Sequence, residues 1–332
     1  MPTFCRHNHL IQNCPICTRE QAVEMRPIVS SSAPRTTQPR PGMPRPTRAG
    51  SAPSRSRGGS GARGVVVRRV ARGADDGYRS ALVLGLKSSA DAGRLAEEIA
   101  FAEYRLRVLE HEPPGLYREV ADPAGAVEER SWLAFLIAYL GPLEEEDPFA
   151  EIARVRTTWA SGEMPVLHEV RTGPRTAHDP SRGTRTLDAY RAWAGRSGSQ
   201  SAAFLGDAGW SPERRFARVF ERLALPGLQR DARFDLLVTL GRLGVYEVTG
   251  GTLVLGGSDD VTVGAKRAFG IGDPMLLERR ASELARACGV AHEALDLALH
   301  NWQRSERATA GLGPGAEPDP EILAAVQSAL NL

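Results

Sequence analysis

The sequence predicts a mostly α-helical protein whose main domain runs from about residue 64 to 304 and begins with a small β-hairpin. Apolar residues recur at helical spacing in one segment after another from Ser88 onward. These segments end at glycine or proline and begin after Ser or Asp, the residues that favour helix ends. With 42% hydrophobic and 25% charged residues, the composition is that of an ordinary globular protein.

Residues 1–20 predict a zinc knuckle in front of this domain. They contain three of the four cysteines, two of them in the pair Cys14-Pro15-Ile16-Cys17. In a chain expected to be cytoplasmic, this spacing indicates zinc rather than a disulfide, and three thiolates with one imidazole complete a closed tetrahedral site. A redox pair and an incidental cluster are the alternatives, and His9 competes with the preferred histidine. The predicted structural zinc ligands are Cys5, His7, Cys14 and Cys17.

Residues 21–63 predict a disordered basic linker. Pro, Ser, Gly and Arg dominate this segment, and the stretch from Arg26 to Arg72 has eleven arginines and no acidic residue. Such a segment cannot bury enough apolar surface to fold. Its arginines either contact DNA phosphates without regard to sequence, or the segment is only a tether.

The domain begins with a predicted hairpin of two strands, Val65–Val70 and Ala81–Leu86, joined through Gly73 to Gly77. A long amphipathic helix follows from Ser88 to about Glu110. The apolar residues of 124–140 lie nearly all round the predicted helix, so we expect it to be the buried central one. Helices are also predicted over 114–121, 147–160, 185–195, 211–224, 274–287 and 291–304.

Two loop segments are predicted in addition. The interval 161–184 is rich in Arg and His and lines either a nucleic-acid groove or an ordinary solvated surface. Residues 305–332 are expected to be a flexible spacer up to residue 317, followed by a short terminal helix from Asp319 to Leu330. Cys288 is expected to be a core residue.

The stretch from Phe234 to Asp273 organises the domain. It predicts a helix that Gly241 and Gly244 end, and a second helix that begins at an acidic pair. Carboxylates at a helix start accept from free N–H groups and favour the positive end of the helix dipole. The acidic pair is Asp259 and Asp260, and the second helix carries Lys266 and Arg267.

This order resembles the core of the helix-hairpin-helix DNA glycosylases, in which a hydrophobic-x-Gly hairpin holds a DNA phosphate and an Asp enters the base pocket. The segment Leu243-Gly244-Val245-Tyr246 resembles the second half of such a hairpin, although Arg242 stands where its first glycine would be. A second candidate, Leu225-Pro226-Gly227-Leu228, has Gln229 in place of the second glycine. The alternative is a helix that ends in glycine, followed by an Asp cap on the next helix.

The wider pattern from about Ser88 to Arg304 is similar to the alpha-glutamyl/putrescinyl thymine pyrophosphorylase family, clade 3. The resemblance rests on LVLGLKSSADAGRLAEEIAFAEYRLRVLE, SWLAFLIAYLGPLEEEDPF, ARFDLLVTLGRLGVYE and DDVTVGAKRAFGIGDP. It implies a glycosylase-like fold and a hypermodified thymine in DNA as the substrate. Phage members of the family are assigned the displacement of pyrophosphate from an activated 5-hydroxymethyluracil by an amine donor. No short catalytic signature transfers residue by residue.

These observations predict an enzyme that acts on a modified thymine in DNA, and a DNA repair glycosylase or a catalytically inert, zinc-containing DNA-binding or adaptor protein is the alternative. The expected catalytic residue is Asp260, which Val261 and Val263 would flank with apolar surface, and Asp259 is the alternative. No apolar stretch approaches the roughly 20 residues that span a bilayer, and the N-terminus has no secretion signal, so we expect no membrane partner and a cytoplasmic location. The expected DNA-contacting residues are Leu243, Gly244, Tyr246, Lys266 and Arg267.

Overall fold

The structure is a computed structural model and describes residues 73–332 of the chain. The chain divides into two compact units, Met1–Val65 and Val66–Leu332, and the first lies outside the described residues. The described part of the second unit is helical and contains no strand. Its helices are α2 (Ser89–His111), α3 (Leu116–Ala121), α4 (Val127–Leu140), α5 (Ala150–Val155), the 3-10 helix η2 (Pro180–Arg182), α6 (Arg185–Arg196), α7 (Gln200–Leu205), α8 (Pro212–Arg222), α9 (Arg230–Arg242), α10 (Asp260–Phe269), α11 (Pro274–Cys288), α12 (Ala294–Arg304) and α13 (Pro320–Leu330).

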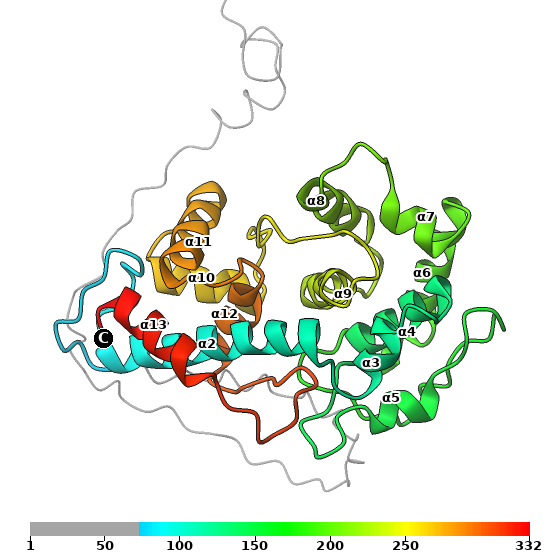
Figure 1. Ribbon diagram of the computed structural model, residues 1–332, viewed down its shortest axis with the longest axis horizontal. Helices are drawn as coiled ribbons and strands as arrows, with labels where there is room; N and C mark the ends of the chain where they lie inside the picture. The colour runs from blue at the N-terminus through cyan, green and yellow to red at the C-terminus, as the bar shows by residue number, and fades with distance from the viewer. Residues whose placement is uncertain (1–72) are drawn as a thin grey trace, which may run out of the picture. The chain divides into compact units, whose positions relative to one another are not determined.

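Helix α2 is the long helix along which much of this unit is arranged (Figure 1). It starts where the Ser88 side chain accepts from the Asp91 N–H, as expected for a serine cap. Helices α12 and α13 pack against it, and α9 contacts it as well. The indole N–H of Trp302 on α12 donates to the Asp91 carbonyl over 3.0 Å. The predicted amphipathic helix is therefore confirmed, and three other helices in the described part of the chain pack on it.

Helix α4 is the buried central helix that its apolar sequence predicts. Every residue from Ser131 to Leu140 is buried. Phe135 stacks on Tyr190 of α6 with ring centroids 3.7 Å apart, and Trp132 stacks on the same tyrosine at 5.9 Å. Helix α4 also packs on α9. It therefore helps to position the stretch from Phe234 to Asp273, which begins within α9.

The predicted β-hairpin is not found where it can be checked. Its first strand lies outside the described residues. Its second, Ala81–Leu86, is irregular because its backbone groups are used elsewhere. The Leu86 N–H closes a turn on the Val83 carbonyl, and the Gly85 N–H donates to the Ala268 carbonyl of α10. A Cβ at Gly85 would lie 2.1 Å from the Arg267 carbonyl oxygen, so close packing on α10 explains this glycine.

Most other helices match their predicted ranges within a few residues. The helix predicted over 147–160 ends early, at Val155, and α7 was not predicted. Helix α7 begins at a Ser199 cap, and the Glu128 carboxylate accepts from two N–H groups of its first turn. This tertiary contact explains why such a short segment is helical. None of the helices described is long and apolar enough to cross a membrane.

The C-terminal segment is packed rather than loose. Its predicted terminal helix is α13, which contacts α2 and α11. The Tyr78 hydroxyl donates to the Leu330 carbonyl over 2.6 Å. Within the predicted spacer, residues 308–311 are buried, and Asn301 both donates to the Ala308 carbonyl and accepts from its N–H.

Candidate functional site

The two predicted catalytic carboxylates lie at the start of α10 but face different surroundings. The Asp259 side chain caps the helix by accepting from the Thr262 N–H and hydroxyl, each over 2.9 Å, and is 19% exposed. It also lies 3.8 Å from the Arg230 guanidinium on α9. The Asp260 side chain is 39% exposed and accepts from Arg304 over 3.0 Å. Of the two, Asp259 is therefore the carboxylate that faces the interior.

The predicted DNA-contacting turn after α9 is only partly at the surface. Leu243 is buried, whereas Gly244 is exposed and has φ of +66°, which suits glycine. Tyr246 is buried, and its hydroxyl lies 2.7 Å from that of Ser131 on α4. Burial raises the pKa of Tyr246 to about 12, so its hydroxyl stays neutral.

The two basic residues of α10 also differ. Lys266 donates to the Gly257 carbonyl over 3.4 Å, in the segment just before the helix. The Arg267 side chain is only 12% exposed and pairs with Asp91 over 3.2 Å. Its guanidinium carbon also lies 4.1 Å from the ring centroid of Trp302, at cation–π distance. Arg267 thus ties α10 to α2 and α12.

The upstream turn connects two helices more directly than the Leu243 turn does. Residues 223–229 join α8 to α9, whereas residues 243–259 separate α9 from α10. Gly227 has φ of +84°, and a Cβ there would lie 2.3 Å from the Thr186 hydroxyl. The Thr186 hydroxyl donates to the Pro226 carbonyl, which fixes the turn against α6. Gln229 makes no side-chain cap on α9.

A buried cluster of arginines and aspartates lies beside the start of α9, and the sequence did not reveal it. Arg175 donates to both carboxylate oxygens of Asp235, over 2.7 and 3.2 Å, and to Asp296 over 2.7 Å. Arg230 donates to the other oxygen of Asp296 and also contacts Asp231 at 3.2 Å. The side chains of Arg175 and Asp296 are 4% and 2% exposed.

The opposite charges of this cluster shift each other's pKa values. Burial opposes the charged forms, but Asp235 and Asp296 outweigh it and raise the pKa of Arg175. Burial likewise favours neutral Asp231, yet Arg175 lowers the pKa of this carboxyl well below its usual range. Burial raises the pKa of Asp296, while Arg230 and Arg175 act against it. Histidine 300 extends the cluster, since His300 Nδ1 lies 3.3 Å from an Asp231 oxygen.

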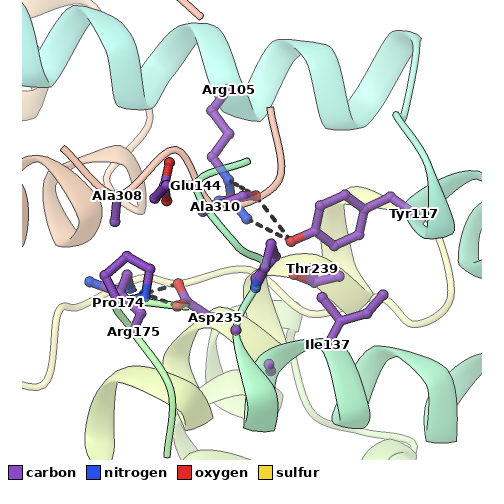
Figure 2. A pocket seen from close by; sticks show the side chains of 13 residues that line it. Arg105, Tyr117, Ile137, Glu144, Pro174, Arg175, Asp235, Thr239, Ala308 and Ala310 are labelled. Atoms are coloured by element: carbon purple, nitrogen blue, oxygen red, sulfur yellow. Dashed lines mark hydrogen bonds and ion pairs between the residues drawn. The ribbon is translucent and has the colours of Figure 1, made fainter. Parts of the chain in front are cut away.

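A small cavity adjoins the cluster (Figure 2). Its space is about 20 Å³, which is enough for about one water molecule. Arg105 of α2 donates to the Ala310 carbonyl over 3.2 Å and to the Tyr117 hydroxyl over 3.4 Å. Glu144 accepts from the Thr309 N–H over 2.8 Å, and burial raises its pKa. The polar residues that line the cavity are Arg105, Tyr117, Glu144, Arg175, Asp235 and Thr239.

The Arg- and His-rich interval 161–184 supplies part of this site. Its Arg175 is buried in the cluster, whereas Arg171 forms ion pairs with Glu145 and Glu151 and His168 is 82% exposed. His178 Nδ1 lies 3.0 Å from the Tyr139 hydroxyl. One signal was present in the sequence, because Asp231, Asp235 and Thr239 recur four residues apart on one face of α9. Their partners on other elements carried no such signal.

The predicted zinc ligands Cys5, His7, Cys14 and Cys17 lie outside the described residues. Within residues 73–332, no group of three or more His, Cys, Asp or Glu side chains is arranged to hold a metal ion. Cys288 is buried, as predicted, and burial raises its pKa to about 11, so its thiol stays protonated.

Residues 174–310 contain the buried cluster, both candidate turns and α10, which together form a helical site built around paired arginines and aspartates. This segment matches the family model of alpha-glutamyl/putrescinyl thymine pyrophosphorylase, clade 3. The family predicted from the sequence is therefore confirmed over this segment. No curated protein and no solved structure matches the chain.

Proposed function

We propose that this protein is an enzyme that acts on a modified thymine in DNA. The family match over residues 174–310 supports this substrate class. The observation that carries the proposal is that Asp259 lies 3.8 Å from Arg230 and so joins the start of α10 to the buried cluster within that segment. Perturbed carboxylates and paired arginines in one place are typical of functional sites.

The proposed reaction replaces pyrophosphate on an activated 5-hydroxymethyluracil by an amine. The amine nitrogen forms a bond to the exocyclic methylene carbon, and the bond from that carbon to oxygen breaks. Pyrophosphate leaves with the electron pair, and a carboxylate takes a proton from the amine. We assign the role of this base to Asp259, because it is the more interior of the two carboxylates. The target base must leave the stack to be reached.

The proposed DNA contact is the turn from Leu225 to Gln229. It joins α8 and α9, and the uncapped start of α9 offers backbone N–H groups that favour an anion. The Arg182 side chain, 49% exposed, approaches Gly227, since its Cδ would lie 3.2 Å from a Cβ built there. The turn at Leu243–Tyr246 is a weaker candidate, because Leu243 and Tyr246 are buried. Lys266 remains a candidate for a further phosphate contact.

One observation favours a catalytically inert DNA-binding protein instead. Both predicted carboxylates already have partners, Asp259 in its helix cap and Asp260 in its ion pair with Arg304. In an inert protein, the helix cap and the ion pair with Arg304 would be the whole role of these two carboxylates. The two functions differ in their products, so a direct assay separates them.

The test is to incubate the full-length chain with DNA that contains either 5-hydroxymethyluracil or its pyrophosphorylated form, with and without an amine such as putrescine. Nucleosides are then identified by mass spectrometry. A new aminated nucleoside, formed only from the pyrophosphorylated DNA, supports the proposal. Release of a free base with an abasic site would show a glycosylase. Unchanged DNA that is nevertheless bound would support the inert alternative.

A further inference from the structure

Arg105 on α2 is a buried guanidinium that lacks a carboxylate partner. The residue is 3% exposed, and its two hydrogen-bond acceptors are neutral: the Ala310 carbonyl and the Tyr117 hydroxyl. Within residues 73–332, Arg105 forms no ion pair, whereas the buried Arg175 contacts two aspartates. A buried charge is stable in a protein only when another charge or several hydrogen bonds compensate for it.

Arg175, which also lines this cavity, has an unused donor. Its Nε and Nη2 atoms donate to Asp235 and Asp296, but its Nη1 atom is buried and has no hydrogen-bond partner. Buried donors without partners are costly and therefore uncommon. In Figure 2, Arg105 reaches in from α2 on one side of the cavity and Arg175 lies beside Pro174 and Asp235 on the other. Two cationic side chains, one without a carboxylate partner and one with an unused donor, thus line the same small cavity.

We propose that this cavity binds a small monovalent anion between Arg105 and Arg175. The anion would compensate the charge of Arg105 and accept from Arg175 Nη1. The space of about 20 Å³ only slightly exceeds what one water needs. It therefore suits an anion of about the size of chloride, or the carboxylate group of a small acid whose remainder lies outside the cavity. This inference does not depend on the proposed reaction.

The other ionisable groups at the cavity are compatible with an anion. Asp235 is held by two hydrogen bonds from Arg175. Burial raises the pKa of Tyr117, so its hydroxyl stays neutral and donates to the Ala310 carbonyl over 3.2 Å. Burial also raises the pKa of Glu144, so this carboxyl takes up a proton more readily than an exposed one. A bound anion favours the protonated form further, and anion binding should therefore tighten as the pH falls.

The experiment compares the thermal unfolding of the full-length chain in sodium chloride, sodium acetate, sodium phosphate and sodium gluconate at equal ionic strength. Gluconate, whose hydroxyl groups make it bulkier than acetate, and phosphate, which is largely divalent near neutral pH, are the comparison anions. Arg105→Met removes the proposed anion contact. Arg107→Met is the matched control, because Arg107 lies two residues further along α2, is 51% exposed and pairs with Glu103.

We expect chloride, acetate or both to stabilise the wild type and Arg107→Met over gluconate. At a concentration one hundred times the Kd, a bound ligand raises the ratio of folded to unfolded protein about a hundredfold. Arg105→Met should lose this anion dependence, and in gluconate it should be at least as stable as the wild type, because a buried unpaired charge has been removed. Stabilisation by acetate alone would identify the carboxylate of a small acid as the ligand. Stabilisation by chloride, with or without acetate, would identify an inorganic anion site.

Two results would overturn the proposal. One is a wild type equally stable in all four salts. The other is an Arg105→Met variant destabilised by the same factor in each salt, which would show that Arg105 serves only its bonds to Ala310 and Tyr117. If Arg105→Met does not fold, crystals of the wild type soaked in bromide decide the question. An anomalous peak between Arg105 and Arg175 supports the site, and its absence at saturating bromide refutes it.

Discussion

Arg175 donates to Asp296 over 2.7 Å, and the two side chains are 4% and 2% exposed. This contact joins the segment before α6 to α12 through the interior. Because the second oxygen of Asp296 accepts from Arg230 at the start of α9, one carboxylate holds two guanidiniums. The cluster therefore fixes three separate segments of the chain around the candidate site.

We predict that Asp296→Asn destabilises the protein by about 3–5 kcal/mol, the usual cost of breaking a buried ion pair by removing one partner. Two guanidiniums would remain buried with less negative charge beside them. Urea unfolding followed by circular dichroism measures the change. Asp260→Asn, which removes a half-exposed partner of Arg304, should change stability by less than about 1 kcal/mol. Equal effects of the two substitutions would contradict the importance of the buried cluster.

Glu144 predicts a pH dependence of stability. Its pKa is raised by burial above the ordinary value of 4.5, so the folded protein binds this proton more tightly than the unfolded chain does. Stability should then fall as the pH rises from about 4.5 through the raised pKa. Glu144→Gln removes this loss, so the variant should be more stable than the wild type near neutral pH and should lose that advantage near pH 4.

The matched control is Glu146→Gln, an exposed glutamate two residues further on. The unfolding free energy of the Glu146→Gln variant between pH 4 and 7.5 should follow that of the wild type. A Glu144→Gln variant that also follows the wild type at every pH would show that the carboxyl at position 144 titrates as an ordinary exposed one.

The sequence predicted the helices well because each carries its own signals. Ser88 and Asp259 cap α2 and α10 as expected, and the apolar run of α4 is buried as predicted. It failed where contacts with distant residues decide the backbone. Ala81–Leu86 has the composition of a strand, but its N–H groups bond to a local turn and to α10. The start of α7 depends on Glu128, which lies 72 residues away from Gln200.

The candidate site was predicted only in part for the same reason. The spacing of Asp259 and Asp260 after α9 was visible in the sequence, and the structure places Asp259 next to Arg230. The partners of the buried cluster come from positions as far apart as Arg175 and Asp296, which are 121 residues apart. A single sequence carries no pattern that pairs such residues, and an arginine in a polar loop reads as a surface residue.

The zinc knuckle remains a prediction from the spacing of the cysteines. We expect one zinc per full-length chain, measured by atomic emission after purification under reducing conditions. Changing Cys14 and Cys17 together to Ser should release it, because a structural zinc site needs all four ligands. The unfolding midpoint of the helical unit should stay unchanged, since its core as described uses none of these residues. A chain purified without zinc would contradict the prediction.

The last prediction separates the two carboxylates at the start of α10. Asp259→Asn should abolish turnover on pyrophosphorylated 5-hydroxymethyluracil DNA, because an amide cannot accept the proton of the amine. Its helix cap should survive, since Asn caps a helix nearly as well as Asp, and stability should fall by about 1 kcal/mol at most because the charge beside Arg230 is lost. Asp260→Asn should keep its activity, because this side chain is 39% exposed and contacts Arg304 rather than the cluster.

The measurements are single-turnover rates by mass spectrometry, DNA affinity by fluorescence anisotropy and stability by urea unfolding, all on the same two variants. DNA affinity of Asp259→Asn should stay the same or rise, because a negative charge near phosphate has been removed. If Asp260→Asn is inactive and Asp259→Asn active, the sequence-based preference for Asp260 holds and the more exposed carboxylate is the base. If both variants turn over at the wild-type rate, neither carboxylate takes part, and the proposed mechanism at α10 is wrong.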